Sequence, residues 1–184
     1  YYIPFDREYW ANIVAEREGK TQTEVMKEWE ETAKISTEFG KKIHLYAENY
    51  ILKKTLPTLV NEKEKLYAKL VTSFIDKNYK LEVIGVEHKI CSEKYLIAGM
   101  IDLLLQNRRG DIFIMDWKNN KKINDSNNYG QTLIQPFEHL HDCELIKYSL
   151  QLSCYKKILE LDGKSIRKCF LIWVTENGCK LIEC

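Results

Sequence analysis

The chain has 184 residues, of which 45% are hydrophobic and 30% are charged, and its formal net charge is +1. These values are typical of one globular domain large enough to bury a core. No apolar run approaches the length of a membrane span and no signal peptide opens the sequence, so we expect an intracellular, cytoplasmic protein without a membrane partner.

The first third of the chain is predicted to be helical. Residues 1–18 mix aromatic and charged side chains, which favours a short helix. Thr21 or Thr23 can cap a second helix, in which apolar residues recur at helical spacing. Gly40 interrupts that pattern, so this region is either one helix or a pair. A further helix is predicted over residues 62–77.

Strand patterns begin after residue 78, and a loop rich in Asn, Asp, Ser and Lys follows the third strand at Asn119–Gly130. A helix is expected at 146–161. The predicted strands cover residues 81–91, 95–105, 112–117, 170–175 and 180–183. Helices, a three-stranded meander, a helix and closing strands indicate an α/β or α+β fold with a central mixed sheet flanked by helices.

Two aspartates and a lysine are predicted to meet at one end of this sheet. Side chains alternate along a strand, so Asp116 and Lys118 share one face and Trp117 lies on the other. A turn near Arg108 places Asp102 roughly opposite Asp116, with Cβ atoms about 5 Å apart. Two such carboxylates can share one Mg²⁺, and Lys118 can orient or deprotonate a water or stabilise a developing anion. The pattern predicts a metal-dependent phosphodiesterase.

These residues resemble the PD-(D/E)XK nuclease superfamily. Ile101-Asp102 followed by Asp116-Trp117-Lys118 matches the motif from which the superfamily takes its name. Its RecB-like exonuclease branch adds a Q-x-x-x-Y motif, matched by Gln151 and Tyr155, and an early glycine and histidine, matched by Gly40 and His44. The motifs stand in the family's order over residues 39–155. The resemblance implies a restriction-endonuclease-like core, with a helical part over 1–60 and a sheet core over 80–184.

The resemblance also implies a Mg²⁺ or Mn²⁺ site. Asp102, Asp116 and His44 would hold the ion together with the backbone carbonyl of Trp117, and the imidazole would favour Mn²⁺. Glu87 lies on the strand before the hairpin, where family members often have a glutamate near the metal. Taken alone, His44 would more often be a structural histidine than a metal ligand. For Glu87, a direct role at the metal and the lack of such a role are about equally expected.

DNA contacts are expected on the last predicted helix and after the lysine strand. Gln151 and Tyr155 lie one helical turn apart, where they can contact phosphates or brace the lysine strand. Taken alone, they also fit an ordinary amphipathic helix. Lys121 and Lys122 form one of several basic pairs. A local basic lining suffices for a phosphate-binding groove, although scattered solvated lysines explain any single pair equally well.

Two features depart from relatives of this kind. Asn119 and Asn120 follow the lysine, where many relatives have threonine or serine. No cysteine precedes Cys91, so the four-cysteine iron–sulfur pattern is missing and no cluster is expected. The six cysteines lack CxxC spacing and are expected to be reduced and partly buried.

The functional expectation is therefore a Mg/Mn-dependent deoxyribonuclease, a hydrolase of phosphodiester bonds that leaves a 5′-phosphate. By resemblance it would be an exonuclease in DNA replication, recombination or repair, alone or within a larger assembly, and in the host cytoplasm if phage-encoded. The substrate is single- or double-stranded DNA, and the oligomeric state stays open. The alternatives are a non-catalytic nucleic-acid-binding or scaffolding module with the same fold, or an RNA-cleaving enzyme.

Overall fold

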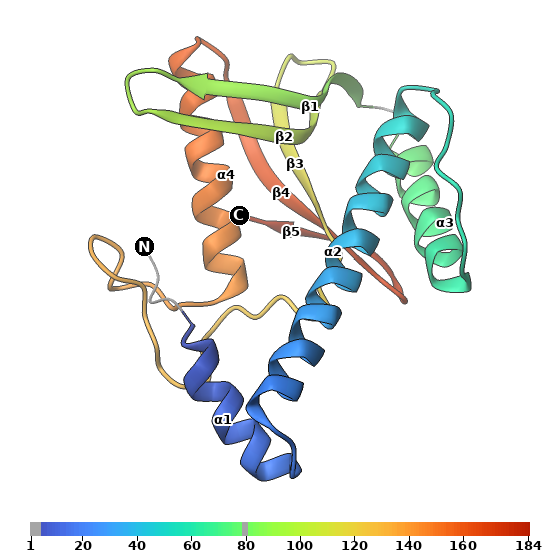
Figure 1. Cartoon of the computed structure of the whole chain (residues 1–184). Coiled ribbons are helices and arrows are strands. Elements are labelled where there is room, and N and C mark those ends of the chain that lie inside the picture. The colour runs from blue at the N-terminus through green and yellow to red at the C-terminus, as the bar shows by residue number, and fades with distance from the viewer. Residues whose placement is uncertain (1–4, 79–80) are drawn as a thin grey trace.

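The computed structural model describes residues 5–78 and 81–184. Over these residues the chain forms four helices and one five-stranded mixed sheet (Figure 1). The predicted α/β architecture with helices flanking a central mixed sheet is confirmed. The first four residues of the helix expected over 1–18 lie outside the described residues.

The N-terminal helices begin at side-chain caps. Helix α1 (Arg7–Glu18) begins after Asp6, whose carboxylate accepts a hydrogen bond from the backbone N–H of Tyr9. Helix α2 (Gln22–Ile51) begins at Thr21 with a complete capping box, so Thr21 rather than Thr23 is the cap. Gly40 does not break α2, which is a single helix of 30 residues. Helix α3 (Glu62–Lys77) has the predicted bounds.

The sheet has the strand order β1-β2-β3-β4-β5. Strands β1 (Glu82–Ser92), β2 (Ile97–Gln106) and β3 (Ile112–Lys118) form the antiparallel meander. Helix α4 (Glu144–Leu161) then crosses over to β4 (Ile166–Thr175), which lies parallel to β3, and β5 (Gly178–Glu183) pairs antiparallel with β4.

Strand β4 begins four residues before the predicted start. Arg167 and Lys168 interrupt the apolar pattern there, but Ile166 is buried and pairs with Ile112 of β3. Lys168 forms an ion pair with Glu183 of β5, at 2.7 Å between Nζ and Oε2. Pairing with neighbouring strands therefore extends β4 across a charged stretch that the sequence pattern excludes.

Two apolar layers hold the helices on the sheet. Ile101, Ile114 and Leu171 pack with Leu152 and Ile158 of α4. The second layer joins the sheet to α2 and α3 through Ile43, Ala47, Tyr67, Val71, Leu103, Met115 and Trp117. The first half of α2 extends beyond the sheet, and α1 packs against this half of the helix. These two segments form an arm (Figure 1).

None of the described helices combines the length and the apolar content that crossing a bilayer requires. The six cysteines are free thiols, and Cys143 and Cys169 are buried. Burial raises the pKa of both the Cys169 and the Cys179 thiol to about 11, which keeps these two groups protonated at neutral pH.

Candidate metal and phosphodiester site

The two predicted aspartates lie where the β2–β3 ladder ends. Leu103 pairs with Met115, so Asp102 and Asp116 occupy the next facing positions. The ladder does not continue there. Instead, Oδ2 of Asp102 accepts a hydrogen bond from the backbone N–H of Trp117 at 2.8 Å. The Asp102 carboxylate is thereby fixed across the gap between the two strands.

Glu87 of β1 comes to the same place by an unusual backbone conformation. The pairs Val86↔Leu103 and His88↔Ile101 place Glu87 opposite Asp102. The φ of Glu87 is 49°, in the left-handed region that residues other than glycine seldom adopt. Strained conformations of this kind concentrate at functional sites, where the surrounding structure holds them.

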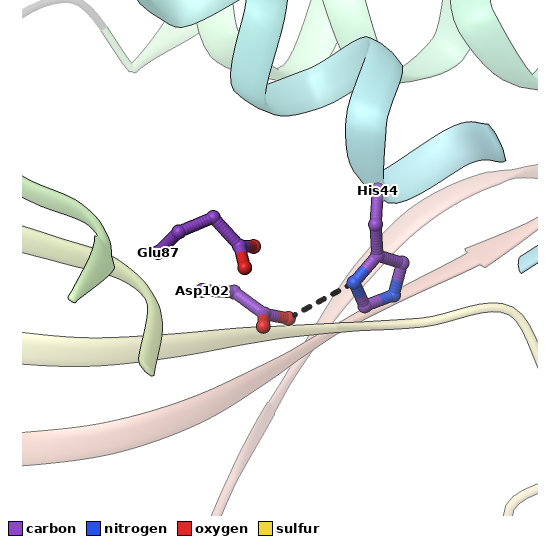
Figure 2. A group of neighbouring side chains, drawn as sticks. All are labelled: His44, Glu87 and Asp102. Carbon is purple, nitrogen blue, oxygen red and sulfur yellow. Dashed lines mark ion pairs between the residues drawn. The ribbon is translucent and has the colours of Figure 1, made fainter. Parts of the chain in front are cut away.

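His44 of α2 completes a group of three potential metal ligands (Figure 2). One ligand atom each from His44, Glu87 and Asp102 lies within 4.8 Å of the other two. Nδ1 of His44 is 3.4 Å from Oδ2 of Asp102. The three side chains come from α2, β1 and β2, so the fold rather than local sequence brings them together. One imidazole and two carboxylates are a donor set that suits a divalent cation such as Mn²⁺.

The electrostatics of this group favour a cation. The pKa of Asp102 is raised by burial first and by the nearby Asp116 carboxylate second, against the opposing effects of His44, the Trp117 N–H and Lys118. The pKa of Glu87 is also raised, by burial and then by Asp102, Glu48 and Asp116. A cavity of about 400 Å³ adjoins the group, so an ion can enter from solvent.

Asp116 and Lys118 form a separate pair beside this group. Asp116 is buried, with 4% of its surface exposed, and its carboxylate binds the ammonium of Lys118. That ammonium also lies 4.7 Å from the ring centroid of Tyr148 on α4. The Tyr148 hydroxyl donates a hydrogen bond to Oδ1 of Asn120 at 3.1 Å. Lys118 is therefore held between a buried acid and an aromatic ring.

The predicted site residues thus fall into two sets. The structure brings His44, Glu87 and Asp102 within ligand distance, whereas Asp116 faces Lys118. The ring of Trp117 packs in the α2–α3 layer against Phe74, with centroids 5.7 Å apart, while its backbone N–H faces Asp102. Sequence reasoning missed Tyr148, although it lies one helical turn before Gln151 on α4.

The Gln151–Tyr155 pair lies farther along α4, against β2. Nε2 of Gln151 donates a hydrogen bond to the Tyr155 hydroxyl at 2.8 Å. The Tyr155 ring fits over Gly99, where a Cβ atom would lie 2.5 Å from Cε1 of the ring. Gly99 therefore provides the space in which Tyr155 packs.

Gly40 has a similar relation to the residues that follow Lys118. A Cβ atom at Gly40 would lie 3.3 Å from Nδ2 of Asn119. The next residue, Asn120, accepts a hydrogen bond from Nε1 of Trp173 on its backbone oxygen at 2.8 Å. Asn120 thus links the segment after β3 to α4 and β4, and the Asn119 side chain lies close to α2 at Gly40. Lys121 and Lys122 follow and are exposed.

No protein-family model matches the chain, and no curated protein sequence matches it, so the functional conclusion depends on the residues described above.

Proposed function

We propose that this chain is a Mg²⁺- or Mn²⁺-dependent DNA nuclease with a restriction-endonuclease-like PD-(D/E)XK core. The observation that supports this most is the convergence of His44, Glu87 and Asp102 beside the Asp116–Lys118 pair and an open cavity. The central mixed sheet flanked by helices also supports the proposal of such a core.

The chemistry follows from the donors and charges of the site. His44, Glu87 and Asp102 would hold the cation, which when bound would supply Lewis acidity to the phosphodiester. Lys118 has its ammonium fixed by Asp116 and Tyr148, so it can hydrogen-bond an attacking water or a phosphoryl oxygen with little loss of side-chain freedom. Water adds to phosphorus, the P–O3′ bond breaks, and a 5′-phosphate and a 3′-hydroxyl are left.

An exonuclease of DNA replication, recombination or repair is the form of this activity that we propose. The first test incubates the protein with end-labelled linear DNA and with a closed circle, in Mn²⁺, in Mg²⁺ and in chelator. We expect degradation of the linear DNA only with metal, and survival of the circle. A circle that is cut at the same rate would make the enzyme an endonuclease.

Variants connect that activity to the site. Asp102→Asn and Lys118→Ala should each lower the cleavage rate by at least about a hundredfold, since the first weakens a ligand of the cation and the second removes the ammonium that contacts the water or the phosphoryl oxygen. Lys89→Ala is the matched control, because Lys89 is exposed on β1 close to Glu87. If Lys118→Ala cuts at the wild-type rate, the mechanism is wrong. DNA binding without cleavage in any metal would indicate a non-catalytic module, and a parallel RNA substrate tests the other alternative.

A further inference from the structure

A second and larger cavity adjoins the candidate site. It has a volume of about 1030 Å³ and lies between α2, the N-terminal end of α3 and the segment 119–121. Gly40 lines both this cavity and the one beside His44. The two cavities are therefore neighbours at Gly40, and the larger one, called the groove below, extends from there toward the start of α3.

Two exposed lysines, from two different segments of the lining, give the groove positive charge. Lys63 of α3 is exposed, and its ammonium lies 4.7 Å from the ring centroid of Phe39 and 5.7 Å from that of Tyr67. The rings hold this ammonium in position without neutralising it. Lys121 lines the groove from the segment after β3 and is also exposed.

A third lysine of the groove has a structural task instead. Nζ of Lys42 is 2.9 Å from Oε1 of Glu64, which is buried and also accepts a hydrogen bond from the Val60 N–H at 2.7 Å. The pKa of Glu64 is lowered, first by the Val60 N–H and next by Lys42, so the carboxylate stays ionised and neutralises Lys42. This pair fastens the start of α3 to α2 and keeps the groove wall in place. Glu38 is an acid on the same lining.

The remaining lining suits a polynucleotide rather than a simple anion. The amides of Asn61, Asn119 and Asn120 offer both donors and acceptors, which can pair with the polar edges of bases. The positive end of the α3 dipole also points to this end of the groove. Lysines that contact phosphates and amides that hydrogen-bond base edges suit an unpaired strand, because the base edges of a duplex are already paired.

We infer that this groove binds a single-stranded tract of the nucleic acid next to the scissile phosphate. Its volume fits a few nucleotides of one strand. Since this volume is that of a few nucleotides of one strand, a duplex would have to open before one strand could enter. The inference rests on the proposed function and adds to it a requirement for an unpaired end.

The test compares Lys63→Gln/Lys121→Gln with Lys69→Gln, all in the Lys118→Ala background so that DNA stays uncut. Lys69 is exposed on the same helix as Lys63, outside the groove lining. The probe is fluorescein-labelled oligothymidylate of about 12 nucleotides, measured by anisotropy over a salt series. We expect the double variant to bind at least about tenfold more weakly and to lower the salt slope by about 1.4, from two lost phosphate contacts. Lys69→Gln should bind like its parent.

Separate outcomes distinguish this inference from the proposed function. If no metal supports cleavage but the double variant loses oligothymidylate affinity, the groove stands and the nuclease proposal fails. If DNA is cut but the double variant binds like Lys69→Gln with an unchanged slope, the inference is wrong. Cleavage of blunt duplex as fast as tailed duplex would also overturn it. Lys121→Gln alone provides a variant without a ring contact, in case loss of Lys63 disturbs α3.

Discussion

The pKa of Asp102 is shifted in opposite directions by different neighbours in the site. Burial and the Asp116 carboxylate raise its pKa, while His44, the Trp117 N–H and Lys118 act in the other direction. The raising influences prevail, and Glu87 beside it is shifted the same way. A site that disfavours its own ionised acids is destabilised until a cation binds, which is a cost that catalytic sites often carry.

The pH dependence of stability should reveal this cost. In the metal-free protein, an acid with a raised pKa binds more protons when folded than when unfolded, between its ordinary and its raised pKa. The ordinary values are 3.8 for Asp102 and 4.5 for Glu87, so this part of the stability falls as pH rises above them. We expect the melting temperature of Asp102→Asn, measured in chelator, to fall less than that of the wild type as pH increases.

Other carboxyl groups titrate over the same range, so the difference between the two proteins is the quantity to compare. Manganese should reverse the trend in the wild type, because metal binding requires deprotonated carboxylates and strengthens as pH rises. Identical pH profiles of wild type and Asp102→Asn in chelator would show that Asp102 titrates as in the unfolded chain.

Sequence reasoning at this scale succeeds where alternation along strands decides the outcome. It places Asp102 next to Asp116 and puts Asp116 on the same face as Lys118, as the structure has them. Alternation alone does not place Glu87 beside His44 and Asp102, and only the resemblance suggests a glutamate there; the register of β1 against β2 and the packing of α2 bring the three together. The contact of Lys118 with Tyr148 depends on how α4 packs on the sheet, so the sequence pattern does not predict it either.

Among the elements, α4 is positioned by a glycine on β2. The Tyr155 ring occupies the space that a side chain at Gly99 would fill. Gly99→Ala should therefore lower the free energy of unfolding by about 1–3 kcal/mol, since either the ring or the backbone must move. Urea unfolding measures this, and Ala98→Ser on the neighbouring, exposed position is the control.

A double-mutant cycle isolates the contact. In a Tyr155→Leu background, Gly99→Ala should cost clearly less, because the ring that it displaces is gone. An equal loss of unfolding free energy in both backgrounds would mean that Gly99 is needed for the backbone conformation of β2 and not to leave space for Tyr155.

The extent of α2 shows what local sequence can and cannot decide for an element. A glycine inside a helix costs about 1 kcal/mol relative to alanine, which is why Gly40 suggests a break. The capping box at Thr21 and the packing of Ile43 and Ala47 outweigh this cost, and the helix continues. Gly40 also leaves room for the amide of Asn119, which belongs to a segment far away in sequence.

For the whole molecule, the candidate site lies at the junction of two structural parts. His44 belongs to α2, which extends beyond the sheet as part of the arm, whereas Glu87 and Asp102 belong to the meander (Figure 1). Apolar packing of α2 joins these parts on one side of the site. A cation held by all three residues would form a second connection, so metal binding should affect the whole fold and not the site alone.

Manganese should accordingly raise the unfolding temperature, with a gain of about 2.7 kcal/mol when the free metal is a hundred times its Kd. Because the ligands lie on both parts, hydrogen exchange should slow in the second half of α2 as well as around Glu87 and Asp102, while α1 stays unchanged. His44→Ala removes the connection to α2 and leaves both carboxylates. It should weaken metal binding and confine the slower exchange to the meander. If His44→Ala shows the wild-type shift and the wild-type exchange pattern, the helix takes no part in binding the ion, and His44 is a structural histidine.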